Sequence, residues 1–355
     1  MPARFSLVSS LSALAALSAC GNAADTAQTP DTTATEAAAE PQILTLYSAR
    51  HYDGDEALYD RFEAETGIRV RARESRAAQL LETMKAEGAA SPADVVIAAD
   101  AGTLWRFKDA GLTQSVESEK LDSAIPAALR DVDGHWFGLA KRYRVIAYDK
   151  ENVAPDSIAA FADLSGEAFD GEICARSSSN IYNLSLLGHL IETQGAEAAE
   201  AWAGSVSGNF ARDPAGGDTD QIKAVAAGAC QVAIANHYYW FRLAGSESES
   251  DRQVTEKTAL VFANAGDGPH VNVTAGAVAA NAPNREAAVA FLEFLATETG
   301  QTMLVAETRE YPVVAGVPLP DGLIPPPDAE PVTPLSRLGE NQVAAQRMFD
   351  RAGWP

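Results

Sequence analysis

The stretch ILTLYSARHYDGDEALYDRFEAETGIRVRAR, residues 43–73, contains one complete strand–helix–strand unit. Its start, 43–48, is rich in apolar and β-branched residues and predicts a strand. Residues 56–66 repeat apolar side chains at helical spacing and end before Gly67, a usual helix stop. Residues 68–73 alternate apolar and basic side chains and predict a second strand. This order indicates a mostly parallel sheet with helices on both faces.

The same alternation continues through the next forty residues and then changes. We expect a helix over 77–87, a buried strand over 94–99 and a helix over 102–110. The segment HWFGLAKRYRVIAYDK, residues 135–150, follows an Asp-Gly turn and predicts two successive extended segments. Extended segments of this kind are typical of crossings between two lobes.

A second block of alternating strands and helices follows the crossing. Its expected elements are strand 171–176, helix 180–193, strand 230–235, and a βα-like block over 259–300 that ends in a long helix from 285. A Pro-rich surface strap over 314–330 and a last helix over 336–352 complete the chain.

These elements predict a bilobed α/β protein of two doubly wound lobes joined by extended hinge strands near 140–147 and 257–264. We place the first lobe at 43–141 plus about 260–355, and the second, inserted lobe at about 142–259. This is the architecture of a periplasmic binding protein that closes on its ligand by a hinge motion.

Composition narrows the possible partners. The chain of 355 residues is 46% apolar, enough for a large core, and carries a formal net charge of −22. Nucleic acid and anionic membranes are excluded as partners, because both require a basic surface. We expect a monomer.

The N-terminus predicts export. Arg4 precedes the apolar segment FSLVSSLSALAALSA, which is too short to span a membrane and ends directly before Cys20. This pattern resembles a lipoprotein signal peptide over 1–19, with a lipidated Cys20. Residues 20–42 have no large apolar side chain after the cysteine and predict a flexible tether. The location is then the periplasm, with the membrane reached only through the lipid.

Two cysteines remain for the exported domain. Cys174 and Cys230 form an even pair in an oxidising compartment, and they lack the paired spacing of zinc ligands. We therefore expect a disulfide between them.

Ligands of parallel sheets bind beyond the carboxyl ends of the strands. The segments at these positions are Ala49–Asp53, Ser177–Asn180 and Asn236–Tyr239, and Tyr143 adds a phenol on the hinge crossing. The adjacent Tyr238 and Tyr239 can converge on one point only where the backbone leaves the strand pleat. Packing is the ordinary use of such a pair, but several phenols at expected ligand positions favour a binding site.

Tyrosinate is a hard anionic ligand whose pKa near ~10 requires a strongly Lewis-acidic cation. Trivalent iron fits this requirement, because softer metals prefer thiolate and imidazole. Three phenolates would cancel the charge of Fe(III) in a partly closed cleft.

Five segments resemble the ferric-ion-binding periplasmic proteins of iron ABC transporters: LYSARHYDGDEALYDRFEAETGI, WFGLAKRYRVIAYDKENV, CARSSSNIYNLSLLGHLIE, CQVAIANHYYWFRL and AVAFLEFLATETGQ with a later YPV. The resemblance covers residues 43 to about 350. It implies a type II binding-protein fold that holds Fe(III) between the lobes and delivers it to a membrane permease.

The resemblance also implies a ligand set. The matching positions are the paired Tyr238 and Tyr239, the first-loop His51 and Tyr52, and Tyr143 at the third-tyrosine position of a tyrosine-rich branch, together with a Cys174–Cys230 disulfide. His51 is either a direct ligand or a partner of one. Another branch uses a glutamate ligand, and here only Glu74 follows the second strand, without a confident alignment.

Other residues have two interpretations. Arg106 balances an anion or a surplus phenolate, or it is a surface helix residue. Ser178, Ser179 and Asn180 bind an anion or cap the following helix. Carbonate as a synergistic anion is left open. Arg142 and Arg144 flank Tyr143 on the opposite strand face, which favours a salt-bridged surface role.

Two other functions are alternatives to iron binding. A type II binding protein for a polyamine or an oxyanion is the first, but neither ligand explains four tyrosines at the cleft. The second is an enzyme, and the chain has no Gly-x-Ser-x-Gly elbow, no His-Glu-x-x-His motif and no phosphate-binding loop. We expect a binding protein and not an enzyme.

Overall fold

The computed structural model describes residues 42–50, 52, 54–327, 331 and 333–355. The signal peptide over 1–19, Cys20, His51 and the tether up to residue 41 lie outside the described residues. Within the described part, no helix is long and apolar enough to cross a membrane.

The opening strand–helix–strand unit forms as predicted. β1 (Gln42–Ser48) pairs in parallel with β2 (Ile68–Glu74) and β3 (Val95–Ala98), and α1 (Asp55–Thr66) and α2 (Ala77–Glu87) connect them. Gly67 ends α1 with a φ of 74°, a left-handed conformation that glycine adopts without strain. α3 (Ala101–Asp109) follows β3.

The described strands form one nine-stranded sheet. Its strand order is β2-β1-β3-β8-β4-β6-β5, and β7 and β9 also pair with β4. The strands beyond β3 are β4 (Phe137–Asp149), β5 (Ile173–Cys174), β6 (Val232–Asn236), β7 (Thr258–Val261), β8 (Val271–Val278) and β9 (Tyr311–Pro312).

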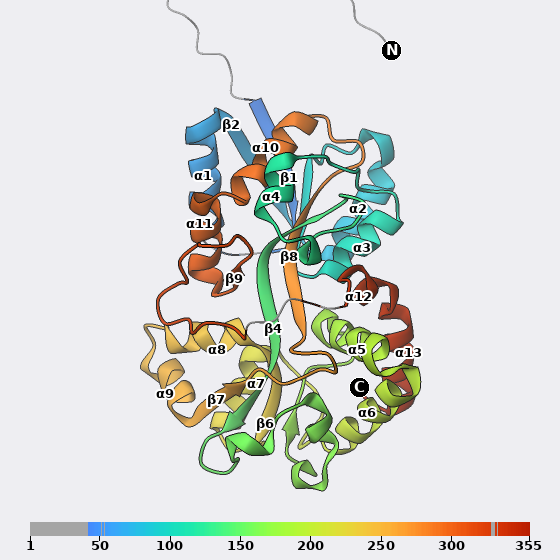
Figure 1. Cartoon of the computed structure of the whole chain (residues 1–355), viewed down its shortest axis with the longest axis vertical. Coiled ribbons are helices and arrows are strands. Elements are labelled where there is room, and N and C mark those ends of the chain that lie inside the picture. The colour runs from blue at the N-terminus through green and yellow to red at the C-terminus, as the bar shows by residue number, and fades with distance from the viewer. Residues whose placement is uncertain (1–41, 51, 53, 328–330, 332) are drawn as a thin grey trace, which may run out of the picture. The chain divides into compact units, whose positions relative to one another are not determined.

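β4 is the strand that joins the two ends of this sheet (Figure 1). Its residues up to Tyr143 pair with β8, and its residues from Arg144 pair with β6. The prediction of two successive extended segments was wrong here, because hydrogen bonds to strands on both sides keep this segment in one extended strand of 13 residues.

Helices pack on both faces of the sheet. The remaining helices are α4 (Glu119–Ala124), α5 (Ile181–Gln194), α6 (Ala196–Gly208), α7 (Asp218–Ala226), α8 (His237–Ala244), α9 (Glu249–Lys257), α10 (Arg285–Leu295), α11 (Glu298–Thr308), α12 (Ser336–Glu340) and α13 (Gln342–Ala352), with five short 3₁₀ helices between them.

The long helix expected from 285 is two helices. The first ends at Leu295, and Thr297 caps the second, because its hydroxyl accepts a hydrogen bond from the Gly300 amide at 3.1 Å. The backbones approach so closely that a Cβ on Gly300 would lie 2.1 Å from the Phe294 carbonyl oxygen. The last predicted helix also divides into two, α12 and α13, at Asn341.

Two main apolar cores divide the described residues, and β4 passes from one to the other between Val145 and Ile146. We call the elements around the core of β1, β3 and β8 the first lobe, and those around β6, α5 and α6 the second lobe. α13 was expected in the first lobe, but it packs on α5 and α6 of the second. Trp354, just beyond α13, contacts Trp202 and Phe210 in that core.

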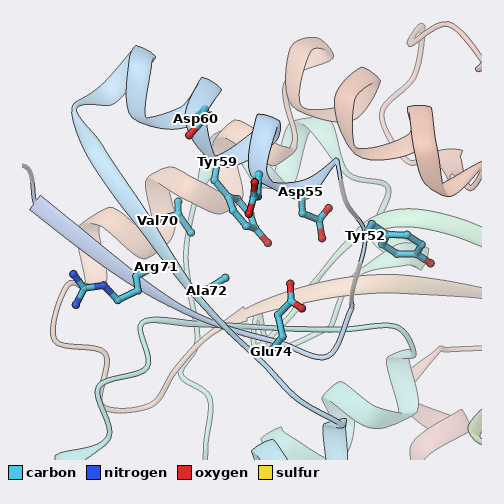
Figure 2. Close-up of a pocket in the computed structure, with 9 residues that line it drawn as sticks. Tyr52, Asp55, Tyr59, Asp60, Val70, Arg71, Ala72 and Glu74 are labelled. Carbon is cyan, nitrogen blue, oxygen red and sulfur yellow. The ribbon is translucent and has the colours of Figure 1, made fainter.

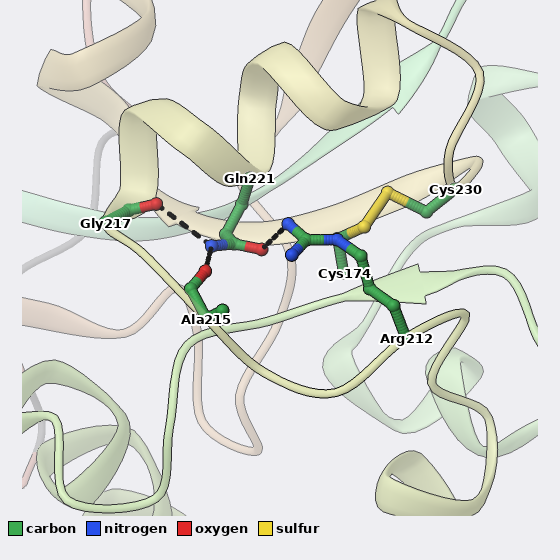
Figure 3. The surroundings of a disulfide bond; sticks show 6 residues. All are labelled: Cys174, Arg212, Ala215, Gly217, Gln221 and Cys230. Atoms are coloured by element: carbon green, nitrogen blue, oxygen red, sulfur yellow. Dashed lines mark hydrogen bonds between the residues drawn. A yellow bond between two sulfur atoms is a disulfide. The ribbon is translucent and has the colours of Figure 1, made fainter.

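The predicted disulfide between Cys174 and Cys230 is confirmed (Figure 3). It links β5 to the residues just before β6, which pair in parallel. Gln221 on α7 lies beside it and holds the neighbouring loop through Gly217 and Arg212. The bond therefore reinforces a strand of only two residues, and Arg176 lies two residues beyond that strand.

Candidate metal centre

Tyr238 and Tyr239 lie in the first turn of α8, directly after β6. Consecutive residues of a helix point about 100° apart, whereas those of a strand point to opposite faces. The two rings converge, with centroids 4.3 Å apart. The convergence of the pair thus results from the strand-to-helix transition that the sequence indicated.

Tyr182 is the third member of this cluster, and the sequence analysis missed it. It lies in the first turn of α5, and the Tyr238 hydroxyl donates to the Tyr182 hydroxyl at 3.3 Å. The signal was present, since Tyr182 follows the Ser177–Asn180 segment at the expected ligand edge by two residues.

Tyr52 completes the cluster from the first lobe. It is half-buried between the guanidinium groups of Arg50 and Arg242, which lie 4.9 and 5.5 Å from its ring centroid. Burial, together with the charges of the nearby Glu310 and Tyr182, raises the pKa of Tyr52 to about 12. Tyr52 is therefore a neutral phenol at pH 7 when no metal is bound.

The two tyrosines of α8 are protonated in the same way. Burial raises the pKa of Tyr238 well above its ordinary value, and Tyr182 and Tyr239 add to the effect. Burial, Tyr182 and Asp218 also raise the pKa of Tyr239. Because Tyr52, Tyr182, Tyr238 and Tyr239 influence one another electrostatically, we call them the tyrosine cluster.

Tyr143, the predicted third tyrosine, lies elsewhere. Its ring packs edge-on against His237, Phe262 and Tyr311, and its hydroxyl donates to the Pro327 carbonyl at 3.5 Å. Side chains alternate along β4, so Tyr143 faces away from the side that Arg142 and Arg144 present to the cluster. The structure does not bring Tyr143 to the other predicted phenols.

Arg142 and Arg144 do point opposite to Tyr143, but the surface role expected for them is wrong. Their side chains are 2% and 1% exposed. Arg142 pairs with Glu310 at 2.9 Å, and Arg144 pairs with Asp218 at 2.6 Å. Burial alone would lower the pKa of Arg142, but Glu310 and the tyrosines of the cluster reverse this and raise it.

Three guanidinium groups surround the Tyr182 ring. Those of Arg142 and Arg144 lie 5.7 Å from its centroid, and that of Arg176 lies 5.6 Å away. Arg176 shares Asp218 with Arg144, at an N–O distance of 3.4 Å. This side of the cluster therefore holds three cations and two carboxylates, which leaves a surplus of one positive charge.

The predicted anion-binding residues do not join the cluster. Arg106 is exposed in the last turn of α3, near Ala77 and Leu81 of α2. Asn180 caps α5, because its side-chain oxygen accepts from the Tyr182 amide at 3.1 Å. The Ser178 amide donates to the Pro355 carbonyl, and the Ser179 hydroxyl contacts that of Ser177. Of this segment, Asn180 provides the expected helix cap, and anion binding by Arg106, Ser178 and Ser179 stays a prediction.

A groove of about 780 Å³ ends at Tyr52 (Figure 2). Its walls come from α1 and β2, and Asp55, Tyr59 and Glu74 point toward its centre. The acidic groups favour a cation over an anion in this approach to the cluster.

The donor set restricts the metal that this site can hold. No group of three or more His, Cys, Asp and Glu side chains in the described part of the chain can hold a metal ion. Phenol oxygens are the donors that converge, and His51, which precedes Tyr52, lies outside the described residues. A hard, highly charged cation is the ion that such donors select.

Two α/β lobes that share one crossing strand, with polar groups of both lobes gathered at the crossing, define a bilobed solute-binding protein. The family model of bacterial extracellular solute-binding proteins matches residues 57–330, and the chain belongs to this family. The binding-protein fold expected from the sequence is thereby confirmed.

The relatives within this family are named for iron. Iron uptake protein A1 of Synechocystis is 43% identical over 321 residues, which are 90% of this chain and 89% of that protein. The solved structure of Trichodesmium FutA (IdiA) with iron and citrate is 45% identical, with a TM-score of 0.84 over 88% of this chain and all of that one. The ferric binding protein of Campylobacter jejuni is 36% identical, with a TM-score of 0.82 over 88% of this chain and 100% of the other.

Proposed function

We propose that this protein captures Fe(III) through the phenolates of Tyr52, Tyr182, Tyr238 and Tyr239 and delivers the ion to the permease of an ABC transporter. The convergence of these four phenols from both lobes is the observation that carries the proposal. Tyr182 takes the place that the sequence analysis gave to Tyr143. His51 adds a further ligand from the loop of Tyr52.

Charge balance supports a ligand set of four phenols. Three phenolates neutralise Fe(III), and a fourth leaves one negative charge in a poorly solvated site. The surplus cation that Arg176 contributes beside Tyr182 opposes this charge. The site then needs no carboxylate ligand, which agrees with the absence of a confident glutamate position in the sequence.

The proposed cellular location rests on the N-terminal sequence and on the relatives. We propose a periplasmic monomer, cleaved after residue 19 and anchored through a lipid on Cys20. The anchor keeps the iron carrier close to the permease. Within this scheme the protein binds and releases its cargo and catalyses no reaction.

A ferric titration tests the ligand set. We expect the purified, metal-free protein to turn orange-red with ferric citrate and to saturate at about one iron per chain, because tyrosinate-to-iron charge transfer absorbs visible light. Tyr182→Phe is expected to shift and weaken this band and to lower iron affinity by roughly 10–100-fold. Tyr143→Phe is the matched control and is expected to leave the band unchanged.

Each other result has a defined meaning. A loss of the band in Tyr143→Phe, with Tyr182→Phe unaffected, would restore the ligand set predicted from sequence. A colourless wild-type protein that retains no iron after desalting contradicts the ferric site and favours a polyamine or oxyanion as cargo. Carbonate as an additional donor predicts a weaker band in bicarbonate-free buffer.

Iron binding is expected to release protons and to weaken at low pH. The phenols of Tyr52, Tyr238 and Tyr239 are protonated without metal, since burial raises the pKa of each, to about 12 for Tyr52. A phenol that binds iron as phenolate gives up its proton. Apparent affinity falls as pH falls, by roughly tenfold per pH unit for each proton released. Proton release measured in weak buffer should be lower by about one proton per iron in Tyr182→Phe than in wild type. Equal release by the two proteins would contradict Tyr182 as an ionised ligand.

A further inference from the structure

The hinge strand β4 changes partners at one position. Tyr143 is the last residue that pairs with β8, opposite Val271, and Arg144 is the first that pairs with β6, opposite Asn236. A strand that passes from one set of partners to the next leaves a backbone group that requires another acceptor. The first core gives way to the second two residues later, between Val145 and Ile146.

The imidazole of His237 fills that position. Its Nδ1 accepts a hydrogen bond from the Tyr143 amide at 3.1 Å. The imidazole therefore carries its proton on Nε2, which donates to the Arg309 carbonyl at 3.2 Å. The side chain is fully buried, and burial lowers its pKa to about 3, so the ring stays neutral.

The contact to Arg309 reaches the first lobe. Arg309 ends α11, and it is the one non-glycine residue in the described part of the chain with a positive φ, at 59°. Two residues later, the Tyr311 ring stacks on His237, with centroids 4.6 Å apart and planes 15° apart. Between them, Glu310 pairs with Arg142, whose guanidinium faces the rings of Tyr182 and Tyr238.

These contacts connect His237 to three elements that hold residues of the metal centre. His237 is the first residue of α8, so its ring fixes the turn that carries Tyr238 and Tyr239. The same ring fixes β4 beside Arg142 and the segment that presents Glu310 to Arg142. One neutral side chain thus connects the tyrosines of the second lobe, the hinge strand and the first lobe.

We propose that His237 is a positioning residue of the hinge, which sets the α8 tyrosines against the first lobe and so slows iron release. The inference rests on the proposed ferric function. It assigns no metal contact to His237, because both ring nitrogens are used by backbone groups.

The test compares His237→Phe with Trp202→Phe. His237→Phe keeps an aromatic ring but removes the Nδ1 acceptor of the Tyr143 amide and the Nε2 donor to the Arg309 carbonyl. The control removes a similar buried bond, from Trp202 Nε1 to the Phe161 carbonyl at 2.8 Å, in the second core, where the Trp202 ring contacts Trp354. Both variants are expected to lower the melting temperature of the metal-free protein.

Iron release separates a positioning role from a purely structural one. With excess chelator at pH 7, we expect release from His237→Phe to be faster on the order of tenfold, with a shifted charge-transfer band, and release from Trp202→Phe to match wild type. His237→Asn keeps an acceptor near the Tyr143 amide but does not reach Arg309, and it should fall between the two. It also serves as the test if His237→Phe does not fold.

Equal release rates in wild type, His237→Phe and His237→Asn would overturn the inference while leaving the ferric site intact. Failure of the ferric function itself has a different signature, since wild type would then show no band.

Discussion

Replacing both Tyr238 and Tyr239 with Phe is expected to abolish the visible band of the iron-loaded protein. The double variant removes two adjacent hard donors from one helical turn and leaves Fe(III) with a surplus positive charge that the remaining phenolates do not cancel. The three guanidinium groups around Tyr182 then repel the ion. We expect no iron to remain after desalting, measured by metal analysis and by absorbance.

The same variant should still fold. Phe keeps both rings, whose centroids lie 4.3 Å apart, and the hydrogen bonds lost include those of the Tyr238 hydroxyl to Tyr182 and from Asn236. At about 1 kcal/mol per hydrogen bond, chemical denaturation of the metal-free protein should show a loss of about 1–2 kcal/mol. Iron retention with wild-type colour would refute the phenolate site. A collapse of the metal-free fold would mean that the pair is chiefly a packing element.

Asp218→Asn is expected to destabilise the metal-free protein more than any other single change considered for this site. The Asp218 carboxylate is fully buried and accepts hydrogen bonds from Arg144 at 2.6 Å and from the Asn236 amide at 2.7 Å. Without it, Arg144 keeps a buried charge that has lost its carboxylate partner. Breaking one side of a buried ion pair costs about 3–5 kcal/mol, which chemical denaturation should detect as a lower midpoint.

The matched control for this variant is Asp251→Asn. Asp251 pairs with Lys223 of α7, the helix that begins at Asp218, but both side chains are partly exposed. Water replaces such a partner readily, so the midpoint should hardly move. Similar losses in both variants would show that burial is not what makes the Asp218 pair important.

The elements that sequence predicted well are those whose signal is local. α1 and α2 each have an apolar repeat and a glycine stop, and their observed bounds differ from the predicted ones by one residue at most. The break at Thr297 was missed because it depends on a side-chain cap and a close backbone approach, not on the apolar repeat. α13 was assigned to the wrong core for a similar reason, since chain order does not say which lobe a terminal helix covers.

For the candidate site too, residues with a local sequence signal were predicted, and those that depend on the tertiary structure were not. The paired tyrosines and Tyr52 were found because the edge rule locates them without knowledge of the tertiary structure. Tyr143 was predicted because it lies on the hinge crossing and matches a tyrosine position of the family, and Tyr182 was not among the candidates. The face of a strand decides which side chain enters the cleft. The Arg142 and Arg144 pairs were misjudged because their partners, Glu310 and Asp218, are distant in sequence and only the fold brings them together.

The insertion of one lobe into the other also decides the order in which this chain can fold. β3 pairs with β8, with Val95 opposite Val278, so the entire second lobe separates two strands that must meet. The second lobe in turn needs α13, from the very end of the chain, to cover its core. While the chain is still emerging, neither core is complete, and the apolar β3 does not yet have β8 to pair with. Under the proposed export, such a chain can complete its two lobes only after its last residues have crossed the membrane.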